Sequence, residues 1–328
     1  MNIKISDTDI GKRCDLFVLS YLQDNGFEDI TRSFLQNNWD NLVKVNDKYV
    51  KPSLKLKEGT SLEINEEMLK EKIEDSIETS IITPQNKELD VVFENSDFII
   101  LNKPSGLVIH PGIRQKENTL ANYVVGYLES KGQYDRRLYR GGVVHRLDKG
   151  VSGLVLFAKT FESQKFFQKK FENREVAKVY IADVTYKNIP NELKKLFEVK
   201  NIDINEALEK LEKGDFVCDD TWYKVEGYIY RSNGNRMKMK FNHENRGKGY
   251  RYSLTYIKPL NNHQILVKIE TGRMHQIRAS LEYLGINIVG DTLYESFSGK
   301  GGIPEEISLR AILLGFEDMQ GERKVFRL

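Results

Sequence analysis

From residue 90 onwards, apolar positions either alternate with polar ones or run unbroken over short segments, and both patterns predict β-strands. The predicted strands are residues 91–93, 98–101, 153–158, 178–184, 222–230, 236–241, 252–257, 264–270 and 311–316. Helical periodicity appears between them near 160–174 and 275–284. Because strands follow strands without a regular strand–helix alternation, we predict an α+β fold with a mixed, largely antiparallel sheet.

The first 65 residues have a different pattern, with two helices before the strands. Leu16, Leu19 and Leu22 lie three positions apart in a predicted helix over 12–23. Thr31 precedes a second short helix over 32–39, as a helix N-cap does. The remaining predicted elements are a hairpin over 43–50, turning at Asn46-Asp47, and a strand at 61–64. This pattern predicts a small, separate α/β unit.

An acidic segment separates the two patterns. Residues 66–80 carry a net charge of −4, and Pro84 follows. We interpret 66–89 as a partly helical linker, with a solvated surface helix as the alternative. The predicted organisation is therefore an N-terminal unit over 1–65 and a larger domain over 90–328. Within the larger domain, the charged residues 187–216 look like a helical insertion.

Composition narrows the class of protein. A hydrophobic share of 40% in 328 residues supplies an ample core. No uninterrupted apolar run is long enough to span a membrane, and the N-terminus has no apolar signal segment. Cys14 and Cys218, the only cysteines, cannot form a disulfide framework. These features are typical of a protein of the reducing cytoplasm, and a net charge of +2 favours no class of partner.

Candidate chemistry is densest in GGVVHRLDKGVSGLVLFAKT, residues 141–160. Asp148 follows an apolar segment and precedes a turn, with Arg146 and Lys149 beside it. An acid in this place is often only a turn cap. Nearby cations also keep a carboxylate charged, and a charged carboxylate can act as a nucleophile.

Two further segments combine basic residues with turns. In ETGRMHQIRASLEYLGINIVGD, residues 270–291, a strand leads into Thr271-Gly272-Arg273, and a helix starts near His275. Ile277, Leu281 and Leu284 would form the apolar face of that helix, so Arg273 and Arg278 are candidates for a site. A solvated basic helix face is the alternative. The third segment is NKPSGLVIHPG, residues 102–112, a loop after a strand that contains a lysine and a histidine. A structured loop without a functional role is the alternative interpretation.

Taken together, these segments resemble the RluA-type pseudouridine synthases. HRLDKGVSG is similar to that family's HRLDxxTSG signature, and the other motifs follow in the family's order. These are LNKPSGLVIHPG, AKVYIADV, TGRMHQIRASLEYLGINIVGD and SLRAILLGF. Residues 12–65 resemble an S4 RNA-binding domain, placed as in RluD-like members. The resemblance implies a pseudouridine synthase fold for the larger domain.

The resemblance also implies roles for individual residues. Asp148 corresponds to the catalytic aspartate, and Arg278 to the basic residue that pairs with it. Tyr180 corresponds to the tyrosine that packs against the target uracil and is proposed to assist proton removal. Ile277 would line the uracil pocket, and Arg146 would accompany extrusion of the base.

The implied activity is the isomerisation of uridine to pseudouridine in structured RNA, with 23S ribosomal RNA or a ribosome precursor as the expected partner. The reaction breaks the N-glycosidic bond and rejoins the base through carbon, so it requires no cofactor or metal. The base must be flipped out of its stack to be reached. Asp148 could attack either the ribose C1′ or the uracil ring. His145 belongs to the signature but is expected to be structural, and the histidine spacing matches no standard zinc pattern.

Basic segments indicate where RNA would bind. Residues 235–251 carry a net charge of +5, and a strand would place Arg236, Lys238 and Lys240 on one face, followed by a hairpin loop. A polar edge strand is the alternative. A second basic group precedes Asp148 and comprises Lys131, Arg136, Arg137 and Arg140.

Three other functions stay open at this point. They are a non-catalytic RNA-binding or ribosome-assembly factor, a metal-dependent nucleic-acid hydrolase, and a synthase that acts on transfer RNA. The hydrolase lacks an acidic or histidine cluster at ligand spacing, and a pure binding protein has no need of Asp148, Tyr180 and Arg278 together. We expect a monomer.

Overall fold

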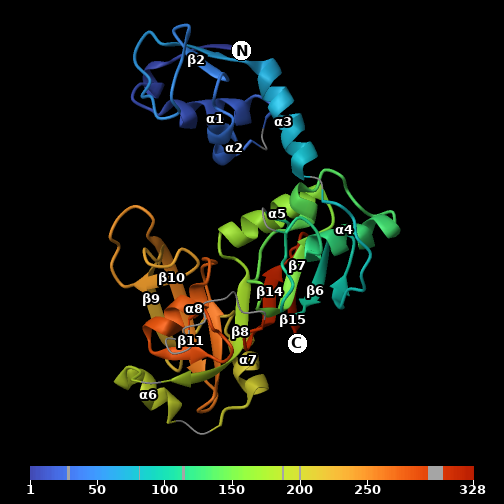
Figure 1. Cartoon of the computed structure of the whole chain (residues 1–328), viewed down its shortest axis with the longest axis vertical. Coiled ribbons are helices and arrows are strands. Elements are labelled where there is room, and N and C mark those ends of the chain that lie inside the picture. Colours follow the sequence, from blue (N-terminus) through green and yellow to red (C-terminus); the bar gives the residue numbers. More distant parts are fainter. Residues whose placement is uncertain (28–29, 81, 113–114, 187, 199–200, 295–305) are drawn as a thin grey trace. The chain divides into compact units, whose positions relative to one another are not determined.

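The computed structural model describes residues 1–27, 30–80, 82–112, 115–186, 188–198, 201–294 and 306–328. The chain divides into two compact units, Met1–Ile81 and Ile82–Leu328, and each has its own hydrophobic core. Figure 1 shows the elements of both units. None of the helices in these described ranges is both long and apolar enough to cross a membrane.

The first unit is a four-stranded antiparallel sheet with helices packed against it. Its elements are β1 Asn2–Lys4, the 3₁₀ helix η1 Asp7–Asp9, α1 Cys14–Asp24, α2 Arg32–Asn37, β2 Val43–Val45, β3 Lys48–Tyr49, β4 Ser61–Ile64 and α3 Glu66–Ser80. The strand order is β1-β4-β2-β3. The hydroxyl of Thr31 accepts a hydrogen bond from the Phe34 amide, which confirms the predicted N-cap. Asn46 and Asp47 both have positive φ and form the predicted tight turn.

The buried face of α1 differs from the predicted one. Leu22 is fully buried, but Leu16 is 43% exposed, and the buried stripe instead joins Cys14, Val18 and Leu22. A helix turns about 100° per residue, so a spacing of three drifts around the axis, whereas a spacing of four stays near one face. The prediction that Leu16 belongs to the core face was wrong.

The predicted linker is structured at both of its ends. Its first part, Glu66–Ser80, is helix α3, and Leu69 is fully buried in the core of the first unit. Its later part belongs to the second unit: Ile82 is buried there, and the Thr83 carbonyl accepts a hydrogen bond of 2.8 Å from Asn122. The boundary between the two units therefore lies within this segment. Residues on both sides of the boundary pack into a hydrophobic core, which the acidic composition did not indicate.

The second unit is built on an eleven-stranded mixed sheet. Its elements are β5 Val91–Glu94, β6 Phe98–Lys103, α4 Leu120–Ser130, η2 Tyr139–Gly142, β7 Ser152–Ala158, α5 Phe161–Glu172, β8 Ala177–Tyr186, α6 Asn191–Phe197, α7 Ile204–Lys213, β9 Tyr223–Arg231, β10 Met239–Asn242, β11 Arg251–Pro259, β12 Gln264–Ile269, α8 Gln276–Tyr283, β13 Ile286–Ile288, β14 Leu309–Glu317 and β15 Arg323–Arg327. The order is β10-β9-β11-β12-β8-β14-β7-β6-β5, with β13 on β8 and β15 on β14. Only β14 and β7 pair in parallel among these strands, so the predicted fold class is confirmed.

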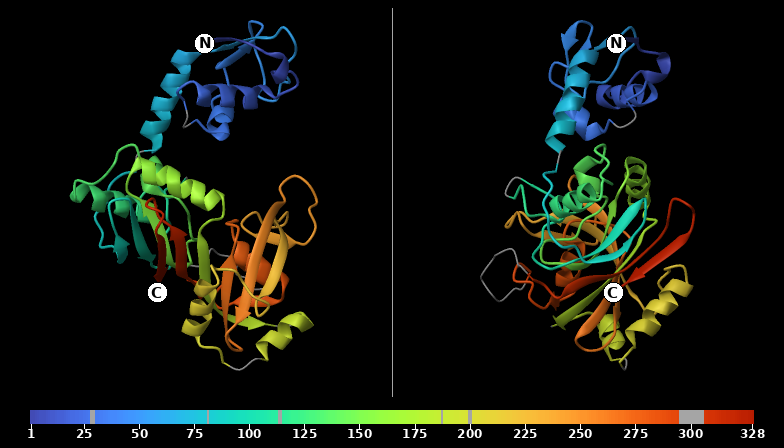
Figure 2. Two further views of the ribbon diagram at one scale, coloured as in Figure 1. Left: turned by 180° about the vertical axis from the view of Figure 1, so that it is seen from behind. Right: turned by 90° about the vertical axis from the view of Figure 1, so that its right-hand side faces the viewer.

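Alternating side chains of this sheet feed separate cores on its two faces. In β6, Ile99 and Leu101 join one cluster with α4 and α8, whereas Phe98 and Ile100 join another with Phe167 of α5. The helix α7, which belongs to the predicted insertion, packs in a third cluster against Val179 of β8 and Leu266 of β12. Figure 2 shows the sheet and its helices from two further directions. Tyr180 of β8 belongs to the face covered by α4 and α8.

Residues 236–251 differ from the predicted strand and hairpin. β10 begins only at Met239, so Arg236 and Lys238 lie before it and do not share a strand face with Lys240. β10 and β11 are not neighbours either, because both pair with β9, one on each side. The loop 243–250 therefore crosses from one side of β9 to the other (Figure 1).

Candidate active site

Asp148 lies in the loop that runs from residue 144 into β7, and the neighbouring loop 104–107 holds this segment in place. The buried ammonium of Lys103 donates hydrogen bonds to the carbonyls of Pro104 and Leu107, both at 2.8 Å, and to that of Lys149 at 3.2 Å. The hydroxyl of Ser105 donates to the Gly150 carbonyl at 2.7 Å. Burial lowers the pKa of Lys103 to about 8, against the favourable charge of Asp148. The first motif thus fixes the loop that carries the acid.

The start of β7 requires glycine. Gly153 has a φ of +109°, and a Cβ there would lie 2.1 Å from the carbonyl oxygen of Ala311 in the parallel strand β14. Any larger residue would push the two strands apart at the point where the Asp148 loop enters the sheet. The glycine of the signature therefore positions the acid.

Arg278 projects from α8 and is shared unequally between two carboxylates. Its Nε and Nη2 each donate to Asp291 at 2.7 Å, whereas its Nη1 lies 3.4 Å from Oδ2 of Asp148. The side chains of Arg278 and Asp291 are 4% and 1% exposed, so this pair is buried. Burial alone would lower the pKa of Arg278, but the hydrogen bonds that it donates to Asp291 raise it, so the guanidinium remains charged.

His275 approaches the same carboxylate oxygen of Asp148 as Arg278 does. Its Nε2 lies 3.7 Å from Oδ2 of Asp148, and its Nδ1 lies 3.2 Å from the hydroxyl of Tyr294. That hydroxyl is itself held by the backbone of Met239. Burial lowers the pKa of His275, although Asp148 opposes the shift. His275 caps α8 with a left-handed φ of +53°, which turns the chain from β12 into the helix.

Tyr180 and Ile277 form an apolar wall beside the acid. Both side chains are nearly buried, at 6% and 5% exposed, and both belong to the large core cluster. Burial and the neighbouring Asp148 charge raise the pKa of Tyr180, so its hydroxyl stays protonated at neutral pH. A flat ring and a branched side chain next to a carboxylate can receive a planar ring against the acid.

These residues line one pocket of about 590 Å³. Of the residues that the sequence analysis singled out, the pocket brings together His145, Arg146, Asp148, Tyr180, Arg273, Ile277 and Arg278. Arg146 is exposed at its edge. The ring of His145 is held by its neighbours: its Nε2 accepts a hydrogen bond of 2.9 Å from the Leu156 amide, and it stacks on Phe171. Burial, aided by the charge of Lys178, lowers the pKa of His145 to about 3, so the ring is neutral.

Four predicted RNA-contact residues lie outside this pocket. Arg137 is paired with Asp135 at 2.8 Å and with Glu162 at 3.0 Å, and Lys238 lies 3.5 Å from Glu282. Arg236 and Lys240 are exposed. Part of the charge that looked available in the sequence is therefore neutralised by nearby acids.

Several residues of the site received no role from the sequence, and Asp291 and Lys103 are two of them. Asp291 closes the third motif, and Lys103 lies in the first, but neither pattern reveals a buried partner. Only the fold shows that Arg278 binds Asp291 more closely than Asp148, and that Lys103 donates to three carbonyls. The sequence signal that could have drawn attention to Lys103 and Asp291 is that each lies inside one of the long motifs.

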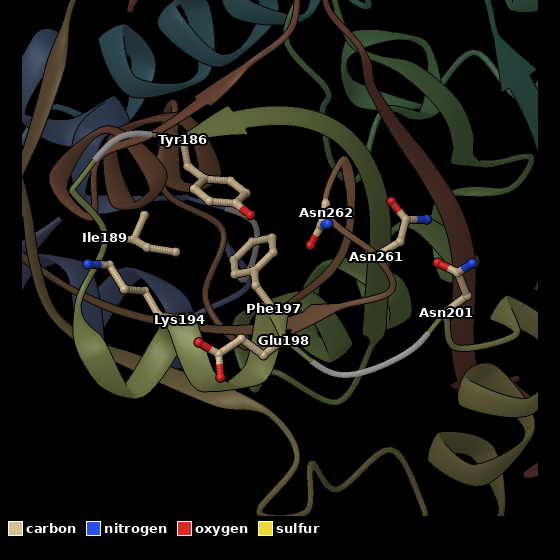
Figure 3. Close-up of a pocket in the computed structure, with 8 residues that line it drawn as sticks. All are labelled: Tyr186, Ile189, Lys194, Phe197, Glu198, Asn201, Asn261 and Asn262. Atoms are coloured by element: carbon tan, nitrogen blue, oxygen red, sulfur yellow. The ribbon is translucent and has the colours of Figure 1, made fainter.

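A second hollow, of about 720 Å³, shares no lining residue with the first. Figure 3 shows its lining, which comprises Tyr186, Ile189, Lys194, Phe197, Glu198, Asn201, Asn261 and Asn262. The rings of Tyr186 and Phe197 pack with centroids 4.5 Å apart. The hollow adjoins α6 of the predicted insertion and contains none of the predicted site residues.

Comparisons with known proteins agree with this geometry. Residues 97–283 match the family model described as RNA pseudouridylate synthase. The chain is 30% identical over 282 residues to "Ribosomal large subunit pseudouridine synthase D" of Borreliella burgdorferi, a match that covers 85% of this chain and 76% of that protein. It is 33% identical over 277 residues to an "Uncharacterized RNA pseudouridine synthase" of Helicobacter pylori, covering 78% and 72%.

The fold is also similar to that of a solved structure, "Human RNA Pseudouridylate Synthase Domain Containing 1". The TM-score is 0.51 at 20% identity, and the match covers 76% of this chain and 86% of that one. The family match contains Asp148, Tyr180 and Arg278, whereas Asp291 lies beyond its end.

Proposed function

Because the chain belongs to the RNA pseudouridylate synthase family, and within it to the RluA type, we propose that it converts uridines of large-subunit ribosomal RNA to pseudouridine with Asp148 as nucleophile. The observation that carries the proposal is the environment of this acid. Its side chain is 22% exposed and opens into the pocket, with Arg278 and His275 behind it and Tyr180 in the wall. The ribosomal substrate is supported by the relative from Borreliella burgdorferi, which is named as a ribosomal large subunit pseudouridine synthase.

The reaction needs one nucleophile and the transfer of a proton from C5 to N1 of the base. The N1–C1′ bond breaks, the base turns, and a C5–C1′ bond forms; C5 then loses its proton, and N1 gains one. Asp148 can hold either the sugar or the ring during the turn, and its attack and departure leave no net oxidation or hydrolysis. Arg278, fixed by Asp291, orients the carboxylate without needing to move.

The pocket admits one base only after that base has left its stack. We assign Tyr180 to stacking on the extruded uracil, Ile277 to the opposite apolar contact, and Arg146 to the place that the base vacates. Arg146 suits that role because it is exposed and makes no hydrogen bond or ion pair with any described residue. Residues 1–65 would act as an S4-like RNA-binding unit in a cytoplasmic monomer.

The test is Asp148→Asn, measured as tritium release from a [5-³H]uridine-labelled transcript of large-subunit RNA. The amide keeps the size of the carboxylate but is not a nucleophile, so turnover should fall at least about 10⁴-fold. RNA binding, measured by filter retention, should stay within about threefold.

Glu129→Gln is the control, because Glu129 is an exposed carboxylate of α4 that does not line the pocket. This control should keep its turnover. Wild-type turnover in Asp148→Asn would contradict the assignment of the nucleophile. RNA binding by the wild-type protein without pseudouridine formation would favour the non-catalytic alternative.

A further inference from the structure

Besides Arg146 and Arg278, three cations line the catalytic pocket. They are Arg174, Lys178 and Arg273, and none was assigned to RNA by the sequence. Arg174 lies in the turn between α5 and β8, Lys178 lies in β8, and Arg273 lies in the loop between β12 and α8. Three separate segments thus bring positive charge to one rim. Glu172 and Asp148 are the carboxylates of the described lining, so the pocket carries an excess of cations.

Tyr252 of β11 fixes the two guanidinium groups. The Nε of Arg273 donates to the Tyr252 carbonyl at 2.9 Å, and the guanidinium carbon of Arg174 lies 5.4 Å from the centroid of the Tyr252 ring. The hydroxyl of that tyrosine donates to Glu226 at 2.7 Å, which holds the ring in place. Neither guanidinium forms an ion pair with an acid in the described part of the chain. Their terminal nitrogens therefore remain available for an anion.

Lys178 is the most unusual of the three. Its side chain is only 6% exposed, yet it forms no hydrogen bond or ion pair with any residue that the structure describes. Its ammonium lies over the ring of Phe171, 5.6 Å from the centroid. The nearest acid to influence it, Glu270, is bound by Lys268. A buried cation without an acidic partner is unfavourable unless an anion arrives from outside.

The charges of this rim also repel one another. Burial lowers the pKa of Arg273, and the charges of Arg251 and Arg174 lower it further. Burial lowers the pKa of Lys178 to about 8; Glu270 opposes the shift, and Lys268 and Arg174 add to it. An anion bound among these groups would relieve the repulsion. The free protein therefore holds a preorganised site for negative charge.

Lys178 and Tyr180 are two residues apart in β8, so their side chains lie on the same face of the sheet. The strand rise of about 3.3 Å per residue separates them by about 7 Å along the strand, a span similar to that from base to phosphate within one nucleotide. We propose that Arg174, Lys178 and Arg273 form a subsite that binds a backbone phosphate of the RNA next to the extruded uridine. This inference rests on the proposed function, since Tyr180 must receive the base.

The first arm of the test uses Lys178→Met and Arg174→Gln, assayed by tritium release on the transcript that the wild-type enzyme modifies. Each variant should raise KM about tenfold with kcat within about threefold, and should reduce the slope of log affinity against log salt by about 1. Lys178→Arg should recover most of the affinity. Lys213→Met, at an exposed position of α7 outside the pocket, should match the wild type. An unchanged KM in both test variants would overturn the proposal.

The second arm changes the RNA and does not depend on turnover. A short fluorescein-labelled RNA containing the target uridine carries one uncharged methylphosphonate, moved through the phosphates within three nucleotides of that uridine, and binding is read by anisotropy. At one position the wild type should lose about tenfold, and Lys178→Met should lose nothing further. Fully additive losses at every position would overturn the assignment.

Inorganic phosphate separates RNA from a free anion as the occupant. Inhibition by phosphate that Lys178→Met abolishes, together with additive methylphosphonate losses, would assign the site to a free anion and overturn the RNA proposal. Failure of the proposed function has a different signature: the wild type would form no pseudouridine on large-subunit RNA, whereas the coupling between Lys178 and one phosphate could still be measured by binding.

Discussion

Two aspartates, one in each unit, show how a fold prepares a carboxylate for stability or for reaction. Asp15 in α1 is fully buried and accepts hydrogen bonds from Arg13, Arg32 and Gln36, at distances from 2.7 to 3.1 Å. Asp148 is partly exposed, and its nearest donor, on Arg278, lies 3.4 Å away. A carboxylate with every acceptor position occupied holds chain segments together. One that is oriented but not saturated keeps an oxygen free to attack.

The second unit separates these two tasks between Asp291 and Asp148. Asp291 accepts both parallel hydrogen bonds from Arg278, and a third at 3.3 Å from the Tyr294 amide. It is therefore the counterpart of Asp15 within the catalytic unit. Because Asp291 holds the guanidinium, Arg278 can direct one nitrogen at Asp148 without binding that acid tightly.

The largest effect in this comparison should come from Arg278→Lys. An ammonium cannot bind Asp291 with two parallel bonds and also reach Asp148, so the proposed nucleophile loses its orientation while the positive charge remains. We expect kcat to fall on the order of 10²-fold, with little change in KM for the RNA. Tritium release gives both constants. Arg323→Lys, at a position of β15 that does not line the pocket, is the matched control. A kcat within threefold of the wild type would show that this orientation is not used.

Asp15→Asn should give the next largest effect, on stability alone. Loss of the buried carboxylate leaves Arg13 and Arg32 without their partner, so the unfolding free energy of the first unit should fall by about 2 to 3 kcal/mol. The chain has two tryptophans, so in a Trp222→Phe background only Trp39, in the first unit, reports on urea unfolding. The exposed Asp7→Asn is the control. A variant as stable as this control would show that Asp15 is not the structural acid described here.

The stability difference between the wild type and Asp15→Asn should also depend on pH. Burial opposes ionisation of Asp15, but hydrogen bonds from Arg13, Gln36 and Arg32 outweigh it and hold its pKa well below the usual range. The folded-state pKa is thus below the unfolded value of about 3.9, so the carboxylate stabilises fully above that pH and loses its contribution as the pH falls. The difference in stability between wild type and Asp15→Asn should therefore shrink below about pH 4.

The smallest expected effect is that of Asp148→Asn on stability. This acid is partly exposed and not needed by Arg278, which keeps Asp291, so the unfolding free energy of the second unit should change by less than about 0.5 kcal/mol. Trp222 fluorescence in a Trp39→Phe background reports on this unit. A loss of 2 kcal/mol or more would make Asp148 a structural acid like Asp15 and remove the contrast.

The sequence predicted the strands of the second unit well, because alternation along a strand follows directly from which face is buried. It missed α4, and the reason is physical. Most of that helix is buried, including the run from Leu120 to Gly126, so it has no polar face to reveal a helical period. Its cap, the reciprocal pair Thr119 and Asn122, also departs from the usual Ser/Thr-to-Glu pattern. The RNA-contact residues Arg137, Arg236, Lys238 and Lys240 remain predictions.

By itself, the sequence determined the family and the fold class and proposed Asp148 as the acid, because motifs of fixed order and spacing are local properties of the chain. The tertiary structure alone decided which charges are satisfied. Arg278 lies 130 residues from Asp148 in the chain and only 13 from Asp291, and it favours Asp291 because both are buried. Lys178 lies in the motif AKVYIADV, but only the fold shows that it is buried without an acidic partner among the described residues. Burial and pairing depend on segments that meet only in the folded protein, and these determine whether a charge stabilises the fold or is available to RNA.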